Sequence, residues 1–301
     1  MESPQTRDSH SCVTFKEQVL IFGGSSKKST FNDLFKYNVS QRMWTKLEAI
    51  FDEGEQPSPR EGHVGVLVDG DKMLVHGGYD ERYSCFSDAF VLVGLHKELD
   101  QAQSEIKYDE NGNVSNVLDL KRRRGQFEML QWFKCEQEGD VPSGRDSHSA
   151  QVVNNQVYVF GGQDANENLL NDFFVVSLVQ SYQKKKITTK NGQIVEFLDR
   201  KFKLRWREIK MSQHRPSAGL GGTIPKRTWP QRRSSHSMTL FMNRYLVVIG
   251  GESPVEHQER EQQNASKESP EKEKGEGSNA IEEKGRRKAE GSDEKASYCS
   301  E

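Results

Sequence analysis

Four arginines and four histidines recur at fixed spacing along the 301-residue chain. Each arginine lies three residues after a proline and three residues before a histidine. The arginines are Arg7, Arg60, Arg145 and Arg233, and the histidines are His10, His63, His148 and His236. A guanidinium group can bind a carboxylate through two parallel hydrogen bonds, and an imidazole can bind a metal ion. Because the histidines belong to four separate copies of the pattern, local spacing does not bring them to one metal, and we expect them to form structural hydrogen bonds.

Basic clusters and cysteines are the other side chains that could do chemistry. The four cysteines lie far apart without a C-x-x-C pair, which argues against a zinc or redox site, and we expect no metal and no cofactor. The basic clusters could form a platform for an acidic protein or a nucleic acid, while solvated loop charge is the ordinary explanation. The clusters are Lys121, Arg122, Arg123, Arg124 and Lys184, Lys185, Lys186, the second being followed by Arg200, Lys201, Lys203, Arg205 and Arg207.

The segment between each histidine and a later glycine pair has the pattern of a β-hairpin. Two short runs rich in β-branched and aromatic residues flank a polar turn, as in HSAQVVNNQVYVFGG. Each glycine pair begins 13 or 14 residues after its histidine. The pairs are Gly23-Gly24, Gly77-Gly78, Gly161-Gly162 and Gly250-Gly251. These segments predict the first two strands of a unit that occurs four times.

Two further strands are predicted in each of the first three units. An aspartate 9 or 10 residues after the glycine pair opens a third apolar run, and a tryptophan marks a fourth. The aspartates are Asp33, Asp88 and Asp172, and the tryptophans are Trp44, Trp132 and Trp206. Four antiparallel strands per unit make one blade of a β-propeller.

The glycine pair, the spaced aromatic run and the later tryptophan resemble the kelch repeat, whose period is about 50 residues. The resemblance covers about residues 4–251 and implies an all-β, kelch-type β-propeller that is incomplete, with three full four-stranded blades and two strands of a fourth. The repeats span about 4–50, 57–137, 142–211 and 230–251. We place the propeller domain at 1–251 and a disordered acidic tail, with 14 acidic and 9 basic residues, at 252–301.

The resemblance also implies a role for the arginines. In the kelch family this segment enters the innermost strand near the mouth of the central channel, and in some members arginines there bind acidic peptides. Carried over to this chain, that nominates four protein-binding candidates: Arg7, Arg60, Arg145 and Arg233. The alternative is architectural, with each arginine tying neighbouring blades together through backbone carbonyl groups.

Two units are longer than the repeat requires. The extra residues lie between the third and fourth strands, at about 94–131 and 180–204, and each insertion contains an Asn-Gly step, the strongest short hairpin signal. Alternate connections of a four-stranded meander emerge at the same end, so we expect two protruding hairpins on one side of adjacent blades. A helical or disordered loop is the alternative for 97–105. Loops on rigid scaffolds commonly carry function.

These patterns favour a binding module over an enzyme. We expect a scaffold or adaptor that binds other proteins, including proteins with acidic segments, through its loops and inserted hairpins. The alternative is a metal-dependent enzyme or a specifier-type protein on a kelch propeller. However, the iron-binding pattern E-x-x-x-D-x-x-x-H of specifier proteins has Asn113 in the place of its histidine, after Glu105 and Asp109.

Charge and hydropathy limit which partners and which cellular locations we expect. The body of the chain is nearly neutral and no 18-residue stretch is apolar, so we expect neither a nucleic acid nor a membrane as partner. A cytoplasmic location is expected, and a nuclear one is the alternative because of Lys284, Arg286, Arg287 and Lys288. Because propellers close rings of four to eight blades, the alternatives are a short family member, a truncation and self-association that completes the ring.

Overall fold

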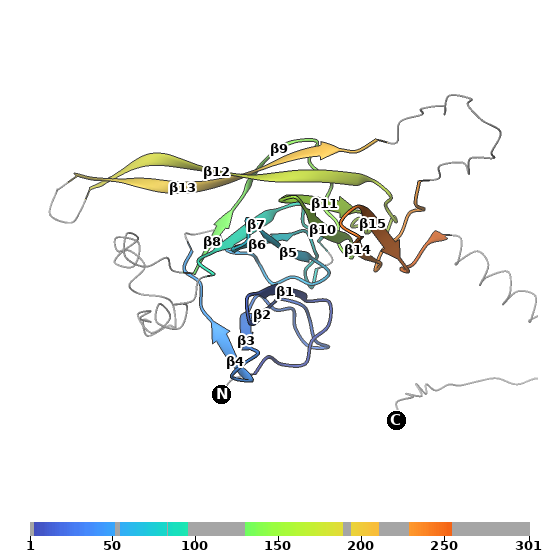
Figure 1. Ribbon diagram of the computed structural model, residues 1–301, viewed down its shortest axis with the longest axis horizontal. Helices are drawn as coiled ribbons and strands as arrows, with labels where there is room; N and C mark the ends of the chain where they lie inside the picture. Colours follow the sequence, from blue (N-terminus) through green and yellow to red (C-terminus); the bar gives the residue numbers. More distant parts are fainter. Residues whose placement is uncertain are drawn as a thin grey trace, which may run out of the picture. The chain divides into compact units, whose positions relative to one another are not determined.

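The computed structural model describes residues 3–51, 55–82, 84–95, 130–188, 194–210 and 229–254. Within these residues the chain forms antiparallel β-meanders, as the all-β prediction requires (Figure 1). The first blade holds β1 (Ser11–Phe15), β2 (Gln18–Phe22), β3 (Leu34–Asn38) and β4 (Met43–Leu47). The second holds β5 (Val64–Val68), β6 (Lys72–His76), β7 (Ala89–Val93) and β8 (Gln131–Lys134).

The third blade differs from the expected four-stranded unit. It holds β10 (Ser149–Val153), β11 (Gln156–Phe160), β12 (Phe173–Thr188) and β13 (Ile194–Glu208). A fifth strand, β9 (Glu136–Gly139), runs parallel to β13 along its outer edge. This strand lies where the second predicted repeat ends, and the sequence pattern predicted no separate strand there. The fourth sheet contains β14 (Ser237–Phe241) and β15 (Tyr245–Ile249).

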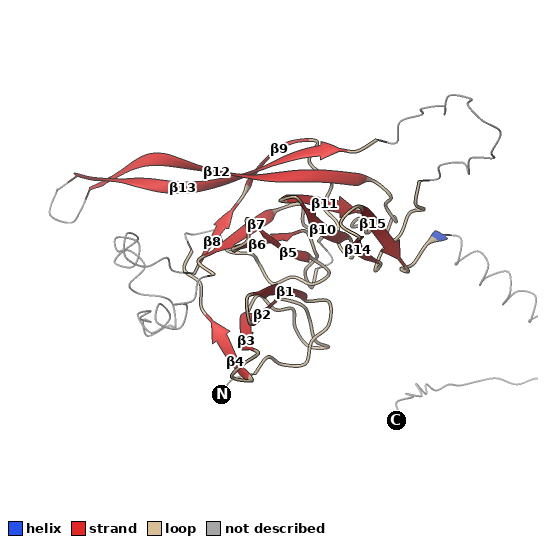
Figure 2. Ribbon diagram, in the orientation of Figure 1, coloured by secondary structure: helices blue, strands red, loops and turns tan. Residues whose placement is uncertain are grey.

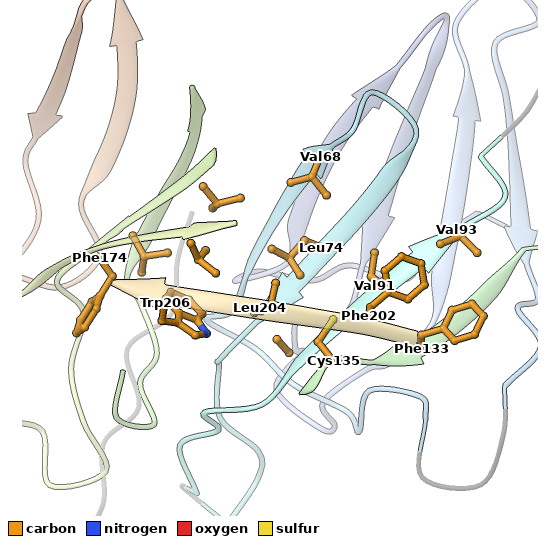
Figure 3. Packing of buried hydrophobic residues seen from close by; sticks show 14 residues of the cluster. Val68, Leu74, Val91, Val93, Phe133, Cys135, Phe174, Phe202, Leu204 and Trp206 are labelled. Atoms are coloured by element: carbon orange, nitrogen blue, oxygen red, sulfur yellow. The ribbon is translucent and has the colours of Figure 1, made fainter. Parts of the chain in front are cut away.

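Buried side chains fill the space between neighbouring blades. All five residues of β7 are buried, because the second blade is covered on both faces. Its Phe90 and Leu92 belong to the cluster shared with the first blade, and Val91 and Val93 to the cluster shared with the third. Figure 3 shows the second cluster, to which β13 contributes Phe202, Leu204 and Trp206. Alternation along one strand therefore serves two interfaces.

A repeated set of contacts joins each blade to the next. The second glycine of each pair donates its N–H to the backbone carbonyl of the next blade's arginine, over 2.8–2.9 Å, and the next blade's histidine packs its ring edge against the residue before the pair. The glycine–arginine bonds join Gly24 to Arg60, Gly78 to Arg145 and Gly162 to Arg233. The ring contacts join His63 to Phe22, His148 to His76 and His236 to Phe160.

The histidines at these joints form hydrogen bonds, which confirms their expected structural role. His63 Nε2 lies 2.9 Å from Ser11 Oγ, and His236 Nε2 lies 2.7 Å from Ser149 Oγ. Burial, with the nearby positive charge of Arg60, lowers the pKa of His63 to about 3. The ring is therefore neutral at neutral pH, so one nitrogen can donate a hydrogen bond while the other accepts.

The joint between the second and third blades uses a different partner. Ser11 and Ser149 stand opposite Phe22 and Phe160 in their hairpins, and at the same place the second blade pairs Val64 with His76. In the second blade the polar side chain is therefore on the second strand of the hairpin instead of the first. His76 Nδ1 lies 3.2 Å from His148 Nε2. His76 thus replaces both the packing ring and the hydroxyl of the other joints.

Replacing His76 by phenylalanine is expected to lower the free energy of unfolding by about 1–3 kcal/mol, because His148 would lose its hydrogen-bond partner inside the interface. The double variant Val64→Ser/His76→Phe recreates the residue pair of the other joints and should recover most of that loss. Urea denaturation of both variants and of Val64→Ser alone measures the effect. A double variant no more stable than His76→Phe would contradict this account of the joint.

Candidate protein-binding surfaces

Each of the first three arginines is bound inside its own blade. The arginine comes just before the first strand of its blade and the aspartate just before the third. The N-terminal ends of these two strands both lie beside the glycine pair at the end of the second strand. Arg145 Nη1 lies 3.1 Å from the Gly161 carbonyl oxygen and 2.6 Å from Asp172 Oδ1, and its Nη2 lies 2.8 Å from Asp172 Oδ2. Arg60 and Arg7 make the same contacts, with Gly77 and Asp88 and with Gly23 and Asp33 respectively.

Aromatic rings enclose these guanidinium groups. The Arg60 guanidinium carbon lies 4.4 Å from the ring centre of Phe86 and 5.2 Å from that of Phe90, and these two residues flank Asp88 at two positions on either side. The side chains of Arg60 and Arg145 are 0% exposed and that of Arg7 is 4% exposed. This geometry favours the architectural alternative. The side chain braces its own blade, while the backbone carbonyls of Arg60 and Arg145 bind the preceding blade.

Arg233 has the same position but fewer partners. Its Nη1 donates to the Gly250 carbonyl oxygen over 2.8 Å, as in the other blades. Among the residues that the structure describes, no carboxylate contacts it, and its hydrogen bonds are exposed. Of the four nominated arginines, Arg233 is therefore the one with an accessible guanidinium group.

The second basic cluster lies on the long hairpin of the third blade, and its lysines are exposed. Lys185 Nζ lies 2.9 Å from Asp199 Oδ2, and Lys186 Nζ lies 2.6 Å from Glu196 Oε1 on the opposite strand. Lys184 has no ion pair among the described residues. The first cluster, Lys121, Arg122, Arg123 and Arg124, lies outside the described part of the chain, as does most of the first insertion.

The basic residues at the base of β13 face an acidic neighbouring strand. Arg205 Nε lies 2.6 Å from Glu138 Oε1 and Lys203 Nζ lies 3.2 Å from Glu138 Oε2, both across the parallel pairing with β9. Hydrogen bonds from these two cations hold the pKa of Glu138 below its usual value. Much of the positive charge that the sequence places here is therefore balanced within the sheet.

The β12–β13 hairpin continues well beyond the blade. β12 pairs with β11 only as far as Val176, and β13 pairs with β9 only from Lys203 onward, while the two strands pair with each other out to Thr188 and Ile194. Residues 177–188 and 194–202 are here called the ribbon (Figure 2). Within the described part of the chain, no other strand pairs with either backbone edge of the ribbon. The predicted hairpin is confirmed for these residues. Tyr182 and Ile194 are 55% and 68% exposed on it.

A loop that the sequence patterns did not single out forms a shallow hollow of about 320 Å³. Residues 25–30, between β2 and β3, line it together with Glu61, Tyr79, Asp80 and Glu81. The loop is held by hydrogen bonds to the second blade, from the Ser25 hydroxyl to Glu61 and from the Thr30 N–H to Glu81. The only sequence signal for it is its place directly after the first glycine pair.

Metal-binding clusters and membrane-spanning helices are both absent from the described residues. No group of three or more His, Cys, Asp or Glu side chains is arranged to hold a metal ion within them. Nor does this part of the chain contain a helix with the length and hydrophobicity needed to span a membrane.

The blades, the glycine pairs and the buried Arg–Asp pairs together define a kelch-type β-propeller domain. The chain matches the family model described as the KLHDC2/KLHL20/DRC7 Kelch-repeats domain over residues 1–103 and 109–265, and it belongs to that family.

Relatives among known proteins share this domain at low identity. The chain is 27% identical over 270 residues to the human leucine-zipper-like transcriptional regulator 1, covering 81% of this chain and 28% of that protein. It is 27% identical over 181 residues to the Drosophila melanogaster homolog of that regulator, covering 60% of this chain and 15% of the relative. It is 24% identical over 194 residues to human Kelch domain-containing protein 3, covering 55% of this chain and 50% of that protein.

The chain therefore spans half or less of the length of each of these relatives. Kelch-repeat domains are generally protein-interaction domains, which supports a scaffold role in coarse terms.

Proposed function

We propose that this chain is a protein-interaction scaffold that binds its partner through the ribbon. One observation carries the proposal: the ribbon extends from the third blade, and no other described strand pairs with either of its backbone edges. Unpaired strand edges are templates for β-strand addition by another chain, and loops on rigid scaffolds are where binding residues concentrate.

The ribbon's surface suggests what the partner carries. Lys184, Lys185 and Lys186 are exposed, and Tyr182 offers a large amphipathic side chain beside them. An acidic, extended partner segment would pair its backbone with the ribbon edge and place carboxylates near Lys184. Lys121, Arg122, Arg123 and Arg124 remain a second candidate binding cluster, outside the described residues.

Replacing residues 182–200 by Asn-Gly tests the proposal. This change keeps the Ser181–Lys201 pair and the buried Phe202, so the blade should remain folded with an almost unchanged melting temperature. We expect proteins that co-purify with the full-length chain to be depleted by about tenfold or more, which corresponds to the loss of about 1.4 kcal/mol of binding free energy.

A control variant distinguishes the loss of the ribbon from the loss of exposed positive charge elsewhere. Lys27→Ala/Lys28→Ala removes two exposed lysines from the loop between β2 and β3 and should leave the co-purifying proteins unchanged. An unchanged set of partners after replacement of 182–200, in a variant shown to be folded by circular dichroism, would exclude the ribbon as the binding surface.

A further inference from the structure

The fourth glycine pair lacks contacts that the first three pairs share. In each complete blade, the first glycine N–H donates to the carbonyl of the aspartate that precedes the third strand, and the second glycine carbonyl accepts from the residue two places before that aspartate. The first set joins Gly23 to Asp33, Gly77 to Asp88 and Gly161 to Asp172, each over 3.2 Å. The second set joins Gly24 to Phe31, Gly78 to Phe86 and Gly162 to Leu170, each over 2.8 Å. Among the described residues, neither Gly250 N–H nor the Gly251 carbonyl has such a partner.

Arg233 has the same position as the arginines that bind the aspartate-bearing segment in the complete blades. Its guanidinium contacts the Gly250 carbonyl, as Arg60 and Arg145 contact the carbonyls of Gly77 and Gly161. In the complete blades, the free side of that guanidinium receives the aspartate carboxylate. Arg233 therefore presents a positive charge and N–H donors that no described residue uses, in the geometry that binds carboxylate elsewhere in this chain.

The strand beside it has a free edge and an uncovered apolar face. β2, β6 and β11 each pair on one side with the first strand of their blade and on the other with the third, whereas β15 pairs with β14 alone in the described part. Ile249 is 60% exposed and Tyr245 is 52% exposed, while Phe22 and Phe160, at the position of Ile249, are 0% and 2% exposed.

We propose that the free edge of β15 is a docking site for an extended segment of a partner protein with the pattern Phe or Leu, any residue, Asp, any residue, Phe. The segment adds antiparallel to β15, with its aspartate on Arg233 and its backbone on Gly250 and Gly251. All three segments that fill the equivalent place in this chain have this pattern: FNDLF from Phe31, FSDAF from Phe86 and LNDFF from Leu170.

The sequence outside the described residues does not supply the pattern. In 1–2, 52–54, 83, 96–129, 189–193, 211–228 and 255–301, no aspartate has both a Phe or Leu two residues before it and a Phe two residues after it. Asp293, for example, is flanked at those positions by Gly291 and Lys295. A partner segment with the pattern fits the charge of Arg233 and the edge of β15 that no other described strand pairs with.

A peptide taken from the first blade provides the probe. We expect a fluorescent peptide with the sequence of residues 30–38, TFNDLFKYN, to bind the full-length chain saturably in an anisotropy titration. The same peptide with Asp33→Asn should bind at least about tenfold more weakly, because it loses the charge-assisted pair with Arg233. This change lies in the peptide and cannot alter the folding of the protein.

Variants of the protein complete the test. Arg233→Ala and Arg233→Lys should each weaken binding of the peptide by about tenfold or more, because neither side chain has the planar guanidinium group. Arg232→Ala removes a neighbouring exposed charge and should leave the affinity unchanged. Equal binding of the Asp33→Asn peptide, full affinity of Arg233→Ala, or no binding at all would each overturn the proposal. A dimer seen by light scattering that the peptide does not dissociate would show instead that a second copy covers the edge.

Discussion

Arg145→Ala is expected to lower the free energy of unfolding by about 3–5 kcal/mol, as does the removal of one partner from other buried ion pairs. The Arg145 side chain is 0% exposed and contributes hydrogen bonds to Gly161 and to both oxygens of Asp172. Its loss leaves a carboxylate at 27% exposure without its counter-ion and opens a cavity beside Phe174, whose ring centre lies 5.3 Å from the guanidinium carbon. Urea denaturation followed by circular dichroism measures the change.

Arg233→Ala is the matched control for this prediction. It removes the same side chain at the same place in the repeat, together with its bond to the Gly250 carbonyl. Because no carboxylate among the described residues depends on Arg233, the expected cost is only about 1 kcal/mol, that of one ordinary hydrogen bond. Similar losses in the two variants would show that the Arg–Asp pair contributes little and that the arginine acts through its backbone alone.

The repeat could be predicted from the sequence because its landmarks are local. Each hairpin, with its apolar runs and polar turn, lies within about 15 residues, so β1 with β2 and β10 with β11 follow from periodicity. The role of the arginines could not be predicted in the same way. Arg145 and Asp172 are far apart in sequence, and they meet only because the third strand returns alongside the glycine pair. A fully buried arginine is also rare enough that exposure is the natural expectation.

The ribbon also shows that local sequence patterns predict a hairpin but not its contacts with distant segments. The Asn191-Gly192 step predicts a hairpin, and β12 and β13 pair with each other over a long stretch, as expected for one. The neutralisation of Lys203 and Arg205 depends on Glu136 and Glu138 of β9, a parallel strand that the sequence pattern did not predict. Parallel pairing between distant segments has no short-range signal, so a cluster that looks basic in sequence is balanced in the fold.

Gly77→Ala should lower the free energy of unfolding by about 3 kcal/mol, the sum of a backbone term and a packing term. Gly77 has a φ of +68°, which disfavours any residue with a Cβ atom. An added Cβ would also lie 2.7 Å from the Arg145 carbonyl oxygen and 2.7 Å from His148 Cε1, so the third blade would have to move. Denaturation curves should show this loss without a change in slope.

Gly250→Ala separates the backbone term from the packing term, because Gly250 has nearly the same φ, +71°, but no atom of the described residues lies within 4 Å of an added Cβ. Its expected cost is about 1 kcal/mol, the backbone term alone. The difference in unfolding free energy between the two variants therefore measures the packing contact between the second and third blades. Equal losses would mean that the blades adjust freely at their joints, and the joint at Gly77 would then not hold the third blade and its ribbon in a fixed position.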